Sequence, residues 1–151
     1  MKKIFYWSPY LSNVATIRNV VNSAYSLIKY DKISFKAYIL DVFGEWDIKK
    51  KELSEKKIEY LKLSNLKINL PISGFLKSRF LSILIFFSSI YPLLKILKKE
   101  KPDYLIIHLL TSIPFSLLIF FNFETKFILR ISGLPRLNFL RKFVWKVVSK
   151  K

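Results

Sequence analysis

The sequence contains no cysteine, one histidine and three glycines among its 151 residues. Without cysteine the chain has no disulfide, no Cys-ligated zinc or iron–sulfur site and no thiol catalysis. A single histidine excludes a multi-histidine metal site within one chain, and we expect no metal. The P-loop and the GxGxxG turn are excluded as well, because both need glycines at spacings that do not occur here.

Acidic residues are few compared with basic ones. Ten Asp and Glu residues stand against 27 Lys and Arg residues, which gives a formal net charge of +17. A charge of this size favours polyanionic partners, namely nucleic acid, an anionic membrane surface or phosphorylated substrates. Hydrophobic residues make up 52% of the chain, so a single domain of this length can bury a sizeable core.

Strand-like and helix-like patterns alternate along the chain. Short apolar runs rich in β-branched and aromatic residues predict strands, at residues 3–7, 33–43, 57–63, 103–108 and 126–132. Apolar residues at helical spacing predict helices, at residues 12–30, 75–99, 111–123 and from 138 onwards. We expect residues 48–57 to form a loop or a short helix. This order predicts an α/β fold, a Rossmann-like and mainly parallel sheet with helices on both faces.

The carboxyl ends of parallel strands form the edge where such sheets bind ligands. His108 ends the buried run "DYLIIH", and Thr111 follows it at the same edge. An imidazole there can hydrogen-bond a substrate, and its ordinary pKa lies near neutrality. The alternative interpretation is a hydrogen-bonded histidine of the core.

The turn "SPYLSNVAT" joins the first strand to the first helix and brings Ser8, Pro9, Asn13 and Thr16 to this edge. A helix N-terminus offers free N–H groups to a phosphate or a carboxylate, and hydroxyl and amide side chains add contacts. The alternative is ordinary capping of the helix by Ser12 or Asn13.

The segment "FGEWD" places two carboxylates and a tryptophan beyond the second strand. Sugars are often bound by carboxylates in combination with the face of an aromatic ring, so Glu45 and Trp46 are candidate sugar-binding residues. The alternative is a solvated turn.

In "LRISGLP", Arg130 stands inside an otherwise apolar strand. A charge there is costly unless it is paired or used, and a guanidinium can bind a phosphate or a carboxylate. Ser132 and Gly133 allow close approach of the backbone. The structural alternative is an internal salt bridge from Arg130 to Asp41 or Glu45.

The longest uncharged run covers residues 80–94. A bilayer span needs about 20 apolar residues, and this shorter run contains three serines and a proline. We therefore expect a buried or interface-touching helix, with a membrane-anchored protein that uses residues 80–97 as the alternative. The basic tail 136–151 fits a membrane-surface or nucleic-acid helix, or simply a solvated face.

Four segments together resemble one family. "KPDYLIIHLLTS" is similar to the PD-x-[VI]-[VI]-x-H segment of the family 4 glycosyltransferases, which have the GT-B fold. "IFYWSPYLSNVATIRNVVNSA", "DVFGEWD" and "RISGLPRLNFLRKFVWK" resemble a bacterial subgroup of these enzymes that builds surface polysaccharides. The resemblance covers essentially the whole chain. One departure is the turn after the first strand, where many members have a Gly-Gly pair and this chain has "SPYLSN".

The resemblance implies that residues 1–151 are the N-terminal, acceptor-binding domain of a two-domain enzyme, inactive without its second domain. The nucleotide-sugar, which is the donor substrate, would bind to that second domain, whose E-x7-E segment this chain lacks. By the same resemblance His108 lines the cleft and orients a substrate by hydrogen bonding, and Arg130, Ser132 and Gly133 face the same cleft. No metal or other cofactor is implied.

The implied partners are a lipid-linked or glycan acceptor and an anionic membrane surface. The implied location is cytoplasmic, peripheral at the inner face of the bacterial plasma membrane. A basic non-enzymatic binding module is a further alternative. Stacking platforms for nucleic acid need aromatic residues interleaved with arginine on one surface, whereas the aromatic residues here stand in apolar strands and helices. We therefore expect no nucleic-acid partner.

Overall fold

The structure is a computed structural model, and it describes residues 1–12, 14–31, 34–69, 74–131 and 139–150. The helices and strands follow in this order: β1 (Lys2–Trp7), α1 (Ala15–Tyr30), β2 (Phe35–Asp41), the 3-10 helix η1 (Asp47–Lys49), α2 (Lys50–Glu55), β3 (Glu59–Lys62), α3 (Phe75–Glu100), β4 (Tyr104–Ile107), α4 (Ser112–Phe120), β5 (Lys126–Leu129) and α5 (Phe139–Val148).

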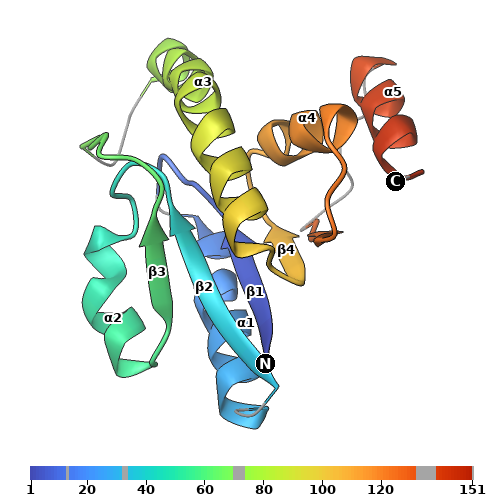
Figure 1. The fold of residues 1–151 in the computed structure, drawn as a ribbon. Coiled ribbons are helices and arrows are strands. Elements are labelled where there is room, and N and C mark those ends of the chain that lie inside the picture. Colours follow the sequence, from blue (N-terminus) through green and yellow to red (C-terminus); the bar gives the residue numbers. More distant parts are fainter. Residues whose placement is uncertain (13, 32–33, 70–73, 132–138, 151) are drawn as a thin grey trace.

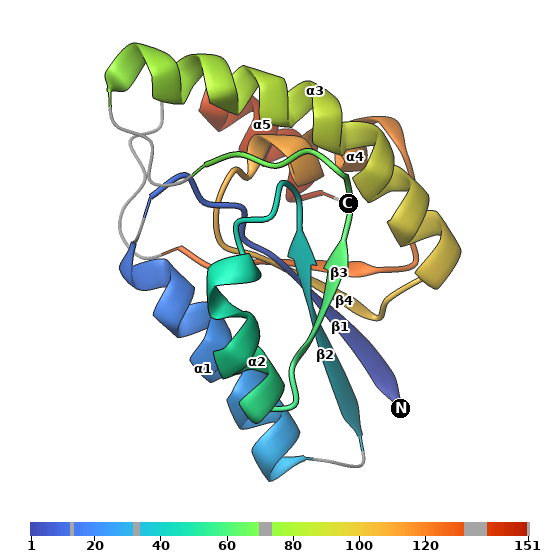
Figure 2. The ribbon, with the colours of Figure 1, turned by 90° about the vertical axis from the view of Figure 1, so that its left-hand side faces the viewer.

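The five strands form one sheet in the order β3-β2-β1-β4-β5, and every pairing is parallel. Helices α1 and α2 cover one face of the sheet, whereas α3, α4 and α5 cover the other (Figures 1 and 2). The predicted α/β fold with helices on both faces of a parallel sheet is therefore confirmed.

Two hydrophobic cores fill the spaces between the sheet and its helices. Because side chains alternate along a strand, Ile4 and Tyr6 of β1 join the core under α1, while Phe5 and Trp7 join the core under α3 and α4. Both faces of the central strand are thus buried, as expected of a parallel sheet.

The amphipathic pattern of the first helix is confirmed. Four apolar residues of α1 at helical spacing, Ile17, Val20, Val21 and Ala24, are buried against the sheet. Residues 48–57, predicted as a loop or short helix, contain most of η1 and all of α2. Since α2 links β2 to β3, it allows these two strands to pair in parallel.

β2 and β5 end two and three residues before their predicted ends, whereas β3 and β4 are shorter than predicted by one or two residues at each end. β2 ends at Asp41 rather than residue 43, because the carboxylates of Asp41 and Glu45 bind the backbone N–H groups of the next residues and turn the chain. β5 ends at Leu129 rather than residue 132, and residues 132–138 lie outside the described residues.

Candidate functional site

Polar residues stand side by side where the five strands end. Trp7 pairs with Ile107, and Ile107 pairs with Leu129, so the residues that follow them are also level across the sheet. The ladder continues to this level, because the N–H of His108 donates to the carbonyl of Trp7 at 3.0 Å and that of Arg130 to Ile107 at 2.9 Å. From β3 to β5, we call the following set the polar row: Lys62, Asp41, Ser8, His108 and Arg130.

The polar row faces the α1 side of the sheet. Tyr6 belongs to the core under α1, and Ser8, two residues later, extends that same face. The ring of His108 is stacked on Tyr6, with ring centroids 6.1 Å apart and an interplanar angle of 26°. The sequence predicts that Ser8, His108 and Arg130 lie at one edge of the sheet. In the structure they follow three neighbouring strands, β1, β4 and β5, at the same level.

The middle of the polar row is buried but incompletely hydrogen-bonded. Ser8 and Asp41 have 0% and 1% of their surface exposed, and His108 has 9%. The Ser8 Oγ and His108 Nε2 atoms have no hydrogen-bond partner among the described residues, whereas the Asp41 carboxylate can accept a hydrogen bond from the protonated Glu45 carboxyl beside it. A buried polar atom without a partner costs about 1–3 kcal/mol, so two such atoms on adjacent strands mark a candidate ligand site.

The imidazole of His108 is uncharged at neutral pH. Burial, and to a smaller extent the positive charge of Arg130, lower its pKa from 6.5 to about 4. A neutral imidazole offers one N–H donor and one acceptor nitrogen. His108 therefore suits hydrogen bonding to a hydroxyl group and does not suit a cationic contact to phosphate.

The sequence pattern places Arg130 inside a strand, but the structure does not. Arg130 follows β5 directly, and its side chain is exposed. The alternative salt bridge to Asp41 is excluded by geometry, because β2 and β5 are separated by two strands, which places them about 14 Å apart. Ser132 and Gly133, the other candidates of this segment, lie outside the described residues.

The N-terminus of α1 lies on the same face, and none of the described side chains caps it. Its N-cap residue is Val14, which makes no side-chain hydrogen bond, so capping by Ser12 is wrong; Asn13 lies outside the described residues. Thr16, in the first turn, is half-buried, and Pro9 is buried after Ser8. The first backbone N–H groups of a helix without a cap are available to an anion.

The loop after β4 is held in a constrained conformation. Leu110 has a φ angle of +46°, a left-handed conformation that is rare for a branched residue. The indole Nε1 of Trp7 donates to the Leu110 carbonyl at 3.3 Å. Thr111 is the N-cap residue of α4, is half-buried and makes no side-chain cap hydrogen bond.

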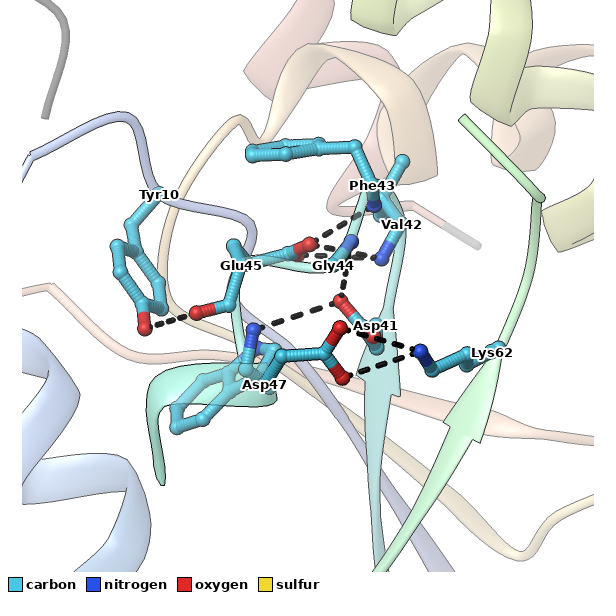
Figure 3. A network of polar contacts seen from close by, with 9 residues as sticks. Tyr10, Asp41, Val42, Phe43, Gly44, Glu45, Asp47 and Lys62 are labelled. Carbon is cyan, nitrogen blue, oxygen red and sulfur yellow. Dashed lines mark hydrogen bonds and ion pairs between the residues drawn. The ribbon is translucent and has the colours of Figure 1, made fainter. Parts of the chain in front are cut away.

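The turn after β2 is a self-contained hydrogen-bonded unit (Figure 3). The Glu45 carboxylate accepts N–H bonds from Val42 and Phe43, the latter at 2.8 Å. Asp41 Oδ1 accepts the N–H of Gly44 at 3.0 Å. The Tyr10 hydroxyl donates to the carbonyl of Glu45, which ties this turn to the loop after β1.

This arrangement argues against the sugar-binding role predicted for Glu45 and Trp46, and equally against a solvated turn. Both residues have 0% of their surface exposed, and the Trp46 ring packs edge-on with Tyr10 at 5.3 Å. Burial, together with the Asp41 carboxyl beside it, raises the pKa of Glu45. The segment "DVFGEWD" thus forms a buried turn beside the polar row and presents no ring face to a ligand.

Two members of the row were not predicted from the sequence as site residues, namely the exposed Lys62 and the buried Asp41. The sequence shows Asp41 near the end of an apolar strand run. Its alignment with Ser8 is visible only from the strand register. A cavity of about 830 Å³ lies elsewhere. It is mostly apolar, sits between β5, α4 and α5, and contains no residue of the polar row, so it is not the chemical site. Among the described residues, no group of three or more His, Asp or Glu side chains could hold a metal ion.

Comparisons with known proteins agree with the fold. No protein-family model matches the chain, and no curated protein matches it in sequence. Among solved structures it is similar to the UDP-GlcNAc 2-epimerase of Neisseria meningitidis bound to UDP-GlcNAc, with a TM-score of 0.58 and 15% sequence identity. The match covers 99% of this chain and 38% of the epimerase chain. At this identity the likeness concerns the fold, and it supports a GT-B-like Rossmann fold.

Proposed function

We propose that this chain is the acceptor-binding domain of a glycosyltransferase that transfers a sugar from a nucleotide-sugar to a membrane-associated or surface-polysaccharide acceptor. The observation that carries the proposal is the polar row at the carboxyl edge of a GT-B-like sheet, where the buried Ser8 Oγ and His108 Nε2 atoms have no hydrogen-bond partner within the described part of the chain. The resemblance of four sequence segments to family 4 glycosyltransferases supports the same assignment.

The chemistry of the row fits a glycosyl acceptor that carries phosphate. A neutral His108, which has 9% of its surface exposed, can donate a hydrogen bond to a sugar hydroxyl or accept one from it. The exposed guanidinium of Arg130 and the uncapped N–H groups of α1 favour negative charge. Together they can hold a sugar at the centre of the row and an anionic group at its sides.

In the proposed reaction, an acceptor hydroxyl forms a bond to the anomeric carbon of the donor, the bond from that carbon to the diphosphate oxygen breaks, and the hydroxyl proton leaves with the nucleoside diphosphate. The chain contributes acceptor positioning through His108 and Arg130. The donor site would lie on a second domain. The comparison supports this division in one respect, since the epimerase that shares the fold is a longer chain and binds UDP-GlcNAc.

We further propose that the enzyme works at the cytoplasmic face of the bacterial plasma membrane. The net charge of +17 favours an anionic lipid surface, and lipid-linked acceptors reside there. The donor would be a soluble nucleotide-sugar, and no metal or nucleic acid takes part.

The test is a transfer assay with the longest polypeptide that the reading frame encodes. Membranes that contain it are incubated with radiolabelled UDP-sugars, and label is followed into lipid and polymer fractions. We expect His108→Ala to lower transfer about 100-fold, the size typical of a lost transition-state hydrogen bond, while Tyr30→Ala, at an 80% exposed residue of α1, leaves transfer unchanged. Full turnover by a folded His108→Ala protein would refute the role of this residue.

One observation favours a second candidate, a small membrane-anchored protein. Within the described residues, α3 contains a segment, Arg79–Glu100, that is long and apolar enough to cross a membrane. However, Ile85, Leu93 and Leu97 of this segment are buried in the core against the sheet, which a spanning helix would have to give up. Extraction of membranes with alkaline carbonate separates the two, because it releases a peripheral protein and leaves an anchored one in the lipid.

A further inference from the structure

We propose that α3 is an interfacial helix, and that one exposed apolar row on it inserts into an anionic lipid leaflet. This inference deepens the proposed function by naming the surface that meets the membrane. It depends on that proposal only for the cellular setting, because the surface is defined by burial and charge alone.

The two halves of α3 differ in what they contact. In the second half, Ile85, Ser89, Leu93 and Leu97 recur every four residues and are buried. In the first half, residues 76–84, none of the described side chains is buried. The first half therefore extends beyond the region in which the sheet covers the helix, as Figure 1 shows for its N-terminal turns.

The exposed apolar residues of α3 form a single row. They are 40–80% exposed, and at 100° per residue they fall within an arc of about 100° on one side of the helix. We call them the apolar row: Leu76, Phe80, Ile83, Leu84, Phe87 and Tyr91. At 100° per residue this row points away from the stripe that includes Ile85 and Ser89. In the second half of α3 one side thus packs on the sheet, and the opposite side of the helix presents large apolar side chains to the exterior.

Charge selects the occupant of this row. Lys77 stands beside its beginning and Lys95 beside its end, both exposed, and no acidic residue occurs between Glu59 and Glu100. Two copies of the row packed on each other would bring these lysines together without a counter-charge. An anionic lipid surface accepts both the apolar side chains and the flanking lysines.

The same geometry argues for a helix that lies in the interface and does not cross it. The helix is fixed to the sheet by its buried stripe, whereas the apolar row is exposed, so the row can meet a lipid surface without unfolding of the domain. An amphipathic helix in this position buries its apolar side at the boundary of headgroups and acyl chains.

The experiment measures flotation of the purified chain with vesicles that contain no nucleotide and no sugar. Vesicles of 30% phosphatidylglycerol in phosphatidylcholine are compared with phosphatidylcholine alone. The test variant is Phe80→Ser with Phe87→Ser, and the matched control is Tyr30→Ser, which removes an 80% exposed aromatic residue from α1 on the other side of the sheet. Circular dichroism confirms that each variant is folded.

We expect the wild type and the control to float with the anionic vesicles, and the double variant to bind at least tenfold less, since burial of one phenylalanine alone is worth about that factor. Carbonate at pH 11 should release the bound wild type. Equal binding by wild type and double variant overturns the proposal, as does wild-type protein that remains in the lipid after carbonate.

A wild type that does not bind vesicles but sediments as a dimer, with a monomeric double variant, also overturns it in favour of a second copy. Because these assays contain no donor or acceptor, their failure is distinguishable from failure of sugar transfer. If the wild-type chain binds the vesicles but the longest encoded polypeptide transfers no sugar, only the enzyme proposal is refuted.

Discussion

Replacing Glu45 with glutamine should remove most of the decrease in the unfolding free energy of the domain that accompanies a rise in pH from 6 to 8. The Glu45 carboxyl has no exposed surface and lies beside the Asp41 carboxyl, and burial first and this neighbour second raise its pKa above the ordinary 4.5. In the folded chain it therefore keeps a proton at pH values where the unfolded chain has lost it.

The sign and size of the effect follow from linkage. A carboxyl whose pKa is raised in the folded state stabilises fully below its unfolded pKa of 4.5, and this contribution is lost as the pH rises towards the folded value. One proton of difference corresponds to about 1.4 kcal/mol of unfolding free energy per pH unit. Between pH 6 and 8 the wild type should thus lose up to about 2.7 kcal/mol through Glu45.

Glutamine preserves the local contacts of the neutral acid. Its amide oxygen can accept the N–H groups of Val42 and Phe43, which now bind the carboxylate at 2.8–3.2 Å. Its NH₂ group can donate to Asp41. The Glu45→Gln variant should therefore unfold at a higher urea concentration than the wild type at pH 8, with a smaller difference at pH 6.

Urea unfolding followed by tryptophan fluorescence at pH 6, 7 and 8 measures this difference. Glu55→Gln, the same chemical change at an exposed position of α2, is the control and should keep the wild-type slope. Parallel stability profiles for the wild type and Glu45→Gln would refute the reasoning, because they would show an ionised Glu45 in the folded chain.

Other substitutions test the polar row and the core. Ser8→Ala should leave the unfolding free energy unchanged or raise it by about 1 kcal/mol, because its buried Oγ has no partner among the described residues; a clear loss in urea unfolding would show that the hydroxyl is satisfied. Leu97→Ala should cost about 2–5 kcal/mol, since Leu97 is 1% exposed, whereas Leu76→Ala, at an 80% exposed position, should stay within about 0.5 kcal/mol; equal effects would contradict the assignment of the buried stripe of α3. Arg130→Gln should raise the pKa of His108 but leave it below 6.5, because burial is the larger cause of the lowered pKa. An unchanged pKa in an NMR titration would show that the charge of Arg130 does not act on His108.

The element order was predictable because each element carries its own period. The spacing of Ile17, Val21 and Ala24 identifies α1, and the apolar runs identify the strands. Parallel pairing followed from the alternation of strands and helices. The end of β2 was not predictable, because it depends on a hydrogen-bonded turn whose donors are backbone N–H groups.

The candidate site was predictable as an edge but not as a geometry. Ser8 and His108 were identifiable because both follow apolar strands, yet their alignment with Asp41 depends on register between distant segments. Trp46 misled the prediction, because a tryptophan in a polar turn suggests an exposed ring, whereas this one fills the core under α1. The ligand roles of Ser8, Pro9, Thr16, Thr111 and Arg130 stay predictions.

The most direct test of the central claim uses the fact that His108 is the only histidine. In a chain labelled with ¹⁵N-histidine, the imidazole gives one set of NMR signals, which reports both its pKa and its contacts without assignment. The account predicts a pKa of about 4, and a shift of the ring nitrogen signals when a short-chain prenyl-diphosphate-linked sugar is added. A pKa near 6.5, with ring signals that do not respond to this ligand, would contradict it.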